Sequence, residues 1–470
     1  MNWKANTLMH PFDRTRKSFA VLLGTALISA GALSGPAHAE TLQSALVSAY
    51  ETSDLLEQSR ALLRVEDESV AIALSALRPQ INGSSTITQA DQASNPGGGT
   101  LSSTISLGLE LLLYDSGATA LAVEATKETV LATRASLVNQ EQQVLLSAVQ
   151  AYVAVLRDAR VVILRDNNLR LITQELRAAR DRFEVGEVTR TDVAQAEARL
   201  AEGRGQLVDA QGQLEISREL YRATVGRAPG TLSGIRQLPS LPASADSARL
   251  TGVQNSPSIK QAQHQIKAQE LNVERAKAAL QPRISLSAGI GHSSTRDNNS
   301  SVGLTMNVPL YQGGQLKSLI RQARASLDAS RYNLNQQTRL VRQNVSDSWS
   351  RLAVANAQVE ASDRQIQAAE VAFNGVREEA RLGARTTLDV LDAEQALLDA
   401  RTNRVIAETQ VYDAAYGLLS SMGLLTAEYL NLPVTRYDPT EYYKAVSGAP
   451  TAISPEGRKL DRILQRYQKN

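Results

Sequence analysis

The feature that most constrains this chain is a long internal duplication. Leu113-Tyr114 recurs as Leu310-Tyr311, an offset of 197 residues, and the same offset holds without a gap over more than a hundred residues. It relates Gly117 to Gly314, Tyr152 to Trp349, Gly186 to Gly383, Asp192-Val193 to Asp389-Val390, Ala196-Glu197 to Ala393-Glu394 and Gly226 to Gly423. One supersecondary unit is therefore encoded twice, and the fold must contain two copies of it.

Upstream of these pairs the offset is 203, because Leu77-Arg78-Pro79 corresponds to Leu280-Gln281-Pro282. The extra residues of the first copy fall within residues 91–100, which include an Asn-Pro-Gly-Gly-Gly sequence. Surface turns accept insertions better than packed elements do, so we expect a turn there.

Each copy also contains a very long stretch without proline. The chain has 14 prolines, yet none lies within residues 97–228 or 310–432. Five apolar positions of the first stretch keep a heptad-like spacing that recurs in the second, which is typical of helices packed side by side. The helix between Gly117 and Gly186 would be about 100 Å long. The returning segment is shorter, so the helix before the strands is expected to stack on its end.

Short alternating segments precede each long helix. Apolar and small polar residues alternate over residues 101–111, 284–290 and 302–308, and more weakly after Pro79. This alternation is typical of strands and hairpins. Four strands cannot close a barrel, and lipid tolerates no open sheet edge. The pattern therefore predicts either a membrane barrel shared by several chains or a soluble four-stranded sheet on a helical rod.

The first 39 residues have the pattern of a secretory signal peptide. Arg14, Arg16 and Lys17 precede an apolar run over residues 19–33, and Ala37-His38-Ala39 forms a small-x-small cleavage site. The apolar run is too short for a transmembrane helix, and no later stretch is apolar enough to be one. The net charge of +2 owes much to this segment, so we expect no nucleic-acid partner.

Composition argues against several kinds of chemistry. The chain has no Cys and four His, which excludes disulfides, thiolate metal sites and a Cys nucleophile. It contains no phosphate-binding loop, HExxH or GxSxG motif. We therefore expect no enzymatic activity, no cofactor and no metal site.

Short motifs recur where strands pass into helices and where helices reverse. They are Leu113-Tyr114-Asp115-Ser116-Gly117, Pro309-Leu310-Tyr311-Gln312-Gly313-Gly314, Val185-Gly186 with Thr191-Asp192-Val193, and Gly383-Ala384-Arg385-Thr386 with Leu388-Asp389-Val390-Leu391-Asp392-Ala393. With these motifs at their positions in the duplicated sequence, the chain resembles the TolC family of outer-membrane efflux channels from residue 40 to about residue 443.

The resemblance implies a mainly helical α+β fold. It is an internally duplicated protomer of long antiparallel helices forming an α-barrel, with four strands contributed to a trimeric 12-stranded outer-membrane β-barrel. Each repeat holds a helix, a strand hairpin, a long helix and a return helix. The expected division is a signal peptide (1–39), a first repeat (40–234, hairpin 80–114), a second repeat (235–430, hairpin 283–311), and a C-terminal equatorial segment with a flexible tail (431–470).

The implied function is a trimeric exit channel of a tripartite efflux or type I secretion system. It would passively conduct substrates from an inner-membrane RND or ABC transporter, through a periplasmic adaptor (membrane fusion protein), across the outer membrane of a Gram-negative bacterium. The expected contacts are two further copies, the adaptor, the transporter and outer-membrane lipid, with the helical tunnel in the periplasm. A periplasmic structural or adaptor-like hairpin protein without channel activity is the alternative. The choice between drugs and secreted proteins as cargo stays open.

Asp389 and Asp392 match the family's aspartate ring at the periplasmic entrance. Three residues apart on one helix, they share a face. Three chains would place six carboxylates at one constriction, which favours cations and raises some of the carboxyl pKa values. The alternative is a solvated helix N-terminus, where the helix dipole favours Asp. The first copy offers Asp192 and Gln195 at these positions.

Arg385 matches the family's latch arginine, and Thr191 and Asp192 match its partners. A charge-assisted hydrogen bond between these residues would hold neighbouring hairpins closed. An unpaired surface arginine is the alternative. Ala380 stands where the family archetype has a tyrosine, so part of the latch is missing.

The helix reversals carry two further matches to the family. Val185-Gly186 and Leu382-Gly383 match its adaptor-docking sites. Glycine also suits a helix C-terminus because it accepts a positive φ. A turn role and a docking role are compatible.

Overall fold

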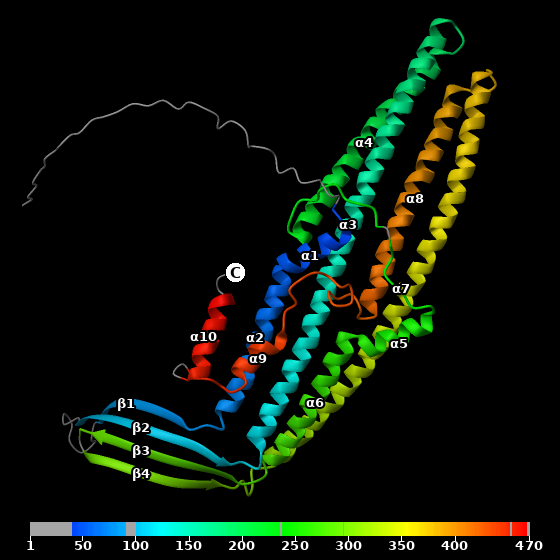
Figure 1. Ribbon diagram of the computed structural model, residues 1–470. Helices are drawn as coiled ribbons and strands as arrows, with labels where there is room; N and C mark the ends of the chain where they lie inside the picture. The colour runs from blue at the N-terminus through cyan, green and yellow to red at the C-terminus, as the bar shows by residue number, and fades with distance from the viewer. Residues whose placement is uncertain (1–39, 91–99, 236, 295, 452–453, 468–470) are drawn as a thin grey trace, which may run out of the picture. The chain divides into compact units, whose positions relative to one another are not determined.

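The computed structural model describes residues 40–90, 100–235, 237–294, 296–451 and 454–467. The predicted signal peptide and the predicted turn at residues 91–99 lie outside these residues. The first half of the described chain runs α1 (Leu42–Thr52), α2 (Asp54–Ser75), β1 (Gln80–Ala90), β2 (Thr100–Tyr114), α3 (Ala118–Glu184) and α4 (Arg190–Val225) (Figure 1).

The second half repeats this order. It runs α5 (Ala245–Asn255), α6 (Pro257–Ala278), β3 (Arg283–Ser293), β4 (Arg296–Asn307), α7 (Gln315–Arg381) and α8 (Thr387–Ser421). The two copies match closely in length, with 11 residues in both α1 and α5, 22 in α2 and α6, and 67 in α3 and α7. The predicted mainly helical α+β fold is confirmed.

The single helix expected before the strands of the first copy is in fact two helices, α1 and α2. Ser53 has an extended backbone that ends α1, and its hydroxyl accepts a hydrogen bond from the backbone N–H of Leu56 to begin α2. The second copy breaks at the equivalent Ser256, followed by a proline at the first position of α6. The helix expected before the strands of the second copy corresponds to α6 alone, and α5 is not predicted from the sequence.

The long helices α3 and α7 each return as a shorter antiparallel helix, α4 and α8. At 1.5 Å per residue, α3 and α7 are each about 100 Å long. Both reversals lie at the same end of this helical region, away from the sheet (Figure 1). Helix α8 also packs against α3, so the two hairpins contact each other.

The predicted end-to-end stacking of the short helices is observed. The hydroxyls of Ser48 and Thr52 in α1 donate to the carbonyl of Val225 at the end of α4, at 2.9 and 3.1 Å. Here Gly226 has φ = +82°, and a Cβ on it would lie 2.4 Å from Thr52 Oγ1. Glycine is therefore required at this junction.

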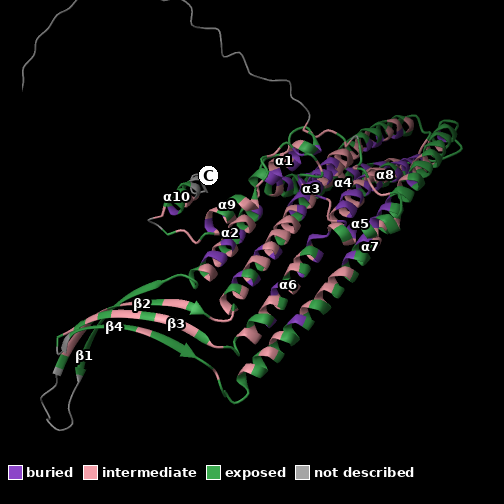
Figure 2. Cartoon of the chain, turned by 60° about the horizontal axis from the view of Figure 1, so that its bottom comes forward, coloured by how far each residue is buried: buried purple, intermediate pink, exposed green. Residues whose placement is uncertain are grey.

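The main core lies where α1, α3, α4, α5, α7 and α8 meet, as Figure 2 shows by the buried residues gathered there. The predicted heptad-like seam supplies part of it, since Val144, Ala148 and Ala151 of α3 and Val345 of α7 are buried. Tyr152 is fully buried, and its hydroxyl lies 2.9 and 2.6 Å from the carbonyl oxygens of Glu40 and Ser233.

The four strands form one antiparallel sheet in the order β1-β2-β3-β4. In this register Leu107 lies opposite Gly83 on β1 and Ile290 on β3, so apolar residues collect on one face. Large apolar side chains there are exposed: Ile81, Ile105, Leu107, Ile290, Val302, Leu304 and Met306. β4 ends at Asn307, before the expected bound at residue 311, and is followed by Pro309, which has no N–H to donate.

Two short helices, α9 (Pro439–Val446) and α10 (Pro455–Tyr467), follow α8 and were not anticipated. α9 packs on α2, where the Tyr442 hydroxyl donates to a Glu68 carboxylate oxygen at 2.6 Å. Arg78 donates to the carbonyls of Gly448 and Ala449. The C-terminal segment is thereby tied to the helix that leads into β1.

Within the described ranges, no helix combines the length and the apolar character needed to span a membrane.

Candidate channel entrance

The helix reversals have the same geometry in both copies. Gly186 and Gly383 have φ of +81° and +79°. The N–H of Gly186 and that of the next residue donate to carbonyls in the last turn of α3, at 3.0 and 2.9 Å. The equivalent bonds at Gly383 are 3.2 and 2.9 Å. These are Schellman motifs, which satisfy the last carbonyls of the long helices. One of these carbonyls belongs to Ala380, which is buried.

The return helices begin with matching capping boxes. In α4 the carboxylate of Asp192 accepts from the N–H and hydroxyl of Thr189, both at 2.8 Å. In α8 Asp389 accepts from the N–H and hydroxyl of Thr386, at 2.9 and 2.8 Å. These hydrogen bonds lower the pKa of the Asp389 carboxyl. The Thr-x-x-Asp spacing would have revealed these caps in the sequence.

The expected crowding of carboxylates would raise pKa values, and it requires further copies of the chain. Within one chain, Asp389 and Asp392 both lie near the start of α8, as predicted. They differ in their partners, however. Asp392 Oδ1 lies 2.5 Å from Arg199 Nη2 on α4, a residue that sequence reasoning did not single out.

The expected latch residues lie near the two reversals but are not joined in one chain. Arg385 Nε donates to Glu379 Oε2 at 2.9 Å, within its own hairpin. Thr191 is exposed, and Asp192 is occupied by its capping box. Among the described hydrogen bonds and ion pairs, none connects Arg385 to Thr191 or Asp192.

The expected docking residues are freely accessible. Val185 is 71% exposed and Leu382 is 78% exposed. Each precedes the glycine of its reversal. The fold therefore displays an apolar side chain at the end of each hairpin.

A buried carboxyl group lies between the hairpins. Glu394 of α8 is 4% exposed, and its Oε1 accepts from Asn168 Nδ2 of α3 at 2.8 Å. Its second carboxylate oxygen has no hydrogen-bond partner among the described residues. Burial raises the pKa of Glu394 to about 7, and the Asn168 hydrogen bond opposes this shift. The sequence does not mark Glu394 as buried. The equivalent residue of the first copy, Glu197, is also a glutamate, yet it is exposed and pairs with Arg180.

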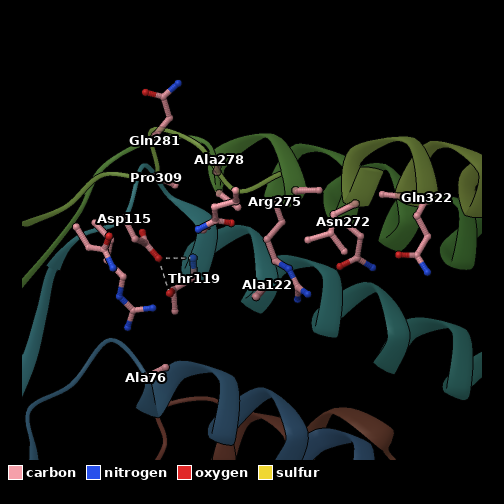
Figure 3. A pocket seen from close by; sticks show the side chains of 18 of the residues that line it. Ala76, Asp115, Thr119, Ala122, Asn272, Arg275, Ala278, Gln281, Pro309 and Gln322 are labelled. Carbon is pink, nitrogen blue, oxygen red and sulfur yellow. Dashed lines mark hydrogen bonds between the residues drawn. The ribbon is translucent and has the colours of Figure 1, made fainter. Parts of the chain in front are cut away.

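A groove of about 830 Å³ lies at the opposite end, where strands pass into helices (Figure 3). It is bounded by α2, α3, α6 and α7 and lined mainly by small and polar residues. Asp115, from a motif common to both copies, accepts from the N–H and hydroxyl of Thr119 at 2.7 and 2.5 Å and so caps α3 (Figure 3). In the described part of the chain, no group of three or more His, Cys, Asp or Glu is placed to hold a metal ion.

The sequence matches the family model described as outer membrane efflux protein over residues 45–227 and 252–424. It is 38% identical over 448 residues to the outer membrane efflux protein BepC of Brucella suis, covering 93% of this chain and 97% of BepC. It is 25% identical over 421 residues to the outer membrane protein TolC of Vibrio cholerae, covering 85% of this chain and 94% of that protein.

Solved channel structures share the fold. The TM-score is 0.73 to CusC, at 19% identity, over 81% of this chain and 92% of that chain. It is 0.72 to the Campylobacter jejuni CmeC outer membrane channel, at 16% identity, over 87% and 90% of the two chains.

The fold is thus that of an outer-membrane channel protomer. The chain belongs to the outer membrane efflux protein family, and the predicted resemblance to TolC channels is confirmed. It is an exit channel of the outer membrane for efflux or secretion, so the alternative of a periplasmic hairpin protein without a channel is set aside. TolC-like channels are trimers that work in tripartite systems. The family consists of transport proteins rather than enzymes.

Proposed function

We propose that this chain forms the passive duct of a tripartite assembly, with the two helix reversals as its periplasmic entrance. An inner-membrane RND or ABC transporter would supply the substrate through a periplasmic adaptor. The observation that carries this proposal is that both hairpins reverse at the same end, away from the sheet with its exposed apolar face (Figure 1). An entrance must lie at the end of the tunnel opposite the membrane barrel.

The ion-selective element of this entrance is the pair Asp389 and Asp392. Both lie within the first two turns of α8, close to the reversal at Gly383. In a trimer they form a ring of six carboxylates, which attracts cations and repels anions. Within one chain, the hydrogen bonds from Thr386 lower the pKa of Asp389, which opposes the rise expected from crowding in the ring and so supports this role.

The gate is the contact between neighbouring hairpins. Arg385 is exposed beside the reversal, and it forms an ion pair with Glu379 of the same hairpin. In the assembled closed channel, Arg385 would bond Thr191 and Asp192 of the neighbouring hairpin. Opening would release these bonds when an adaptor contacts Val185-Gly186 and Leu382-Gly383.

Relatives suggest the class of cargo. BepC, which is named as an efflux protein, matches over 93% of this chain. The alkaline protease secretion protein AprF of Pseudomonas aeruginosa matches over 56%, at 27% identity. Efflux of small compounds is therefore the first candidate, and protein secretion through an ABC exporter is the second. Tyr437-Asp438-Pro439 and Tyr442-Tyr443, which resemble type I secretion members, support the second.

The proposal is tested by the reversal potential of the purified channel in a planar bilayer under a KCl gradient. We expect a cation-selective wild type and a clear loss of selectivity in the Asp389→Asn, Asp392→Asn double variant. Asp209→Asn, on α4 and away from its start, serves as a matched control. Unchanged selectivity in the double variant would refute the aspartate ring.

A further inference from the structure

The two ring aspartates differ in how their charge is balanced. Asp392 Oδ1 of α8 lies 2.5 Å from Nη2 of Arg199, which belongs to the first hairpin. The side chains are 54% and 35% exposed, so this bridge lies at the surface of the seam between α4 and α8. Asp389 instead accepts from Thr386 of its own helix.

The bridge is specific to this seam. At the repeat offset of 197, Arg199 corresponds to Ala396 and Asp392 corresponds to Gln195. Both members of the pair therefore differ from their counterparts in the other copy. The duplication therefore does not account for Arg199 or Asp392, and these two residues contact each other between the copies.

Arg199 also has a partner on its own helix. Its Nη1 lies 3.0 Å from Glu202 Oε2, one turn further along α4. If α4 and α8 separate, Arg199 retains Glu202 and is not left as an isolated cation. Asp392 has no second partner among the described ion pairs, so separation leaves its carboxylate unbalanced.

We propose that Arg199 sets the ion selectivity of the entrance by neutralising Asp392 while α4 lies against α8. This inference rests on the proposed aspartate ring. With the hairpins together, Asp389 is the one ring carboxylate of each chain that makes no direct ion pair among the described residues. With the hairpins apart, each chain presents two such carboxylates. Cation selectivity therefore rises as the gate opens, because charges beyond about 8 Å are screened at physiological ionic strength and Arg199 acts only while it is close.

The test compares reversal potentials in planar bilayers for the full-length trimer and five variants, one of which is Asp392→Asn alone. Arg199→Gln is expected to raise the ratio of K⁺ to Cl⁻ permeability by about twofold, since it leaves the carboxylates of Asp392 and Glu202 without their shared cation. Arg199→Lys keeps the charge and should resemble the wild type. Arg218→Gln removes a similar surface pair on α4, with Glu215, and should change nothing. In the Asp392→Asn background, Arg199→Gln should have no further effect.

Three outcomes overturn the inference. An Arg199→Gln effect that is undiminished in the Asp392→Asn background would mean that Arg199 acts by another route. If Asp392→Asn lowers the cation selectivity and Arg199→Gln leaves it unchanged, the role of Arg199 is refuted while the ring is kept. Selectivity that neither changes would refute the role of Arg199 and the contribution of Asp392, whereas the ring as a whole is tested by the Asp389→Asn, Asp392→Asn double variant. Trimer mobility and circular dichroism establish that each variant is folded.

Discussion

Replacing Glu394 with glutamine should stabilise the contact between the hairpins in a strongly pH-dependent way. Glu394 is 4% exposed, accepts one hydrogen bond from Asn168, and keeps its second oxygen unpaired. Glutamine can keep the hydrogen bond through its own oxygen and carries no charge. The substitution therefore removes the cost of burying a carboxylate.

The magnitude follows from the pKa. In the folded chain the pKa of Glu394 is about 7, against its usual 4.5. The folded state binds the proton more tightly, so the stability that this proton supplies is complete below pH 4.5 and is lost as the pH rises through 7. This difference in pKa corresponds to about 3 kcal/mol at high pH. Most of this advantage of glutamine should develop between pH 5 and pH 8.5.

Hydrogen exchange of the backbone amides of α3 and α8 around this pair measures the free energy of local opening. Glu197→Gln is the matched control, because Glu197 is the equivalent residue of the first copy. It is exposed and pairs with Arg180 at 2.6 Å, so the change should cost at most about 1 kcal/mol. An advantage of Glu394→Gln that is equal at both pH values would refute the reasoning.

Three further substitutions probe the core, the helix junction and the sheet. Tyr152→Phe removes a buried hydroxyl bonded to two carbonyls and should lower the free energy of unfolding by about 1–3 kcal/mol, measured by denaturant unfolding; no loss would contradict this. Gly226→Ala forces a Cβ toward Thr52 at positive φ, so it should lower the melting temperature, and an unchanged value would refute the strain. Leu107→Lys on the apolar sheet face should cost about 2–4 kcal/mol and impair outer-membrane insertion, whereas Ser106→Lys on the opposite face should not; equal effects would contradict the assigned faces.

Much of the fold could be predicted because the duplication exposes it. The repeat offset aligns glycines, and all those at helix ends, such as Gly117, Gly186 and Gly226, have positive φ. The continuous helices α3 and α7 follow from the absence of proline and the shared apolar spacing. The break between α1 and α2 at Ser53 could not be predicted from the local sequence, because a single serine between two helical stretches does not differ from a serine within a helix.

The partners of the candidate site were harder to predict. Asp389 and Asp392 could be found as a pair, but Arg199 and Asn168 lie 193 and 226 residues from the residues they contact. Such contacts depend on how the two hairpins pack, and no spacing within one helix encodes that. The latch between Arg385, Thr191 and Asp192 stays a prediction for the assembled trimer, as does the division of the chain into two repeats and a C-terminal segment.

The central claim is an outer-membrane duct gated at its helix reversals. Single-channel conductance of the purified protein in a planar bilayer tests it most directly, beside Arg385→Ser and the control Arg381→Ser, whose arginine pairs with Glu378 on the same helix. We predict a small cation-selective conductance that grows in Arg385→Ser and not in the control. A folded trimer that conducts equally in all three forms would contradict the gate, and one that does not conduct at all would contradict the duct.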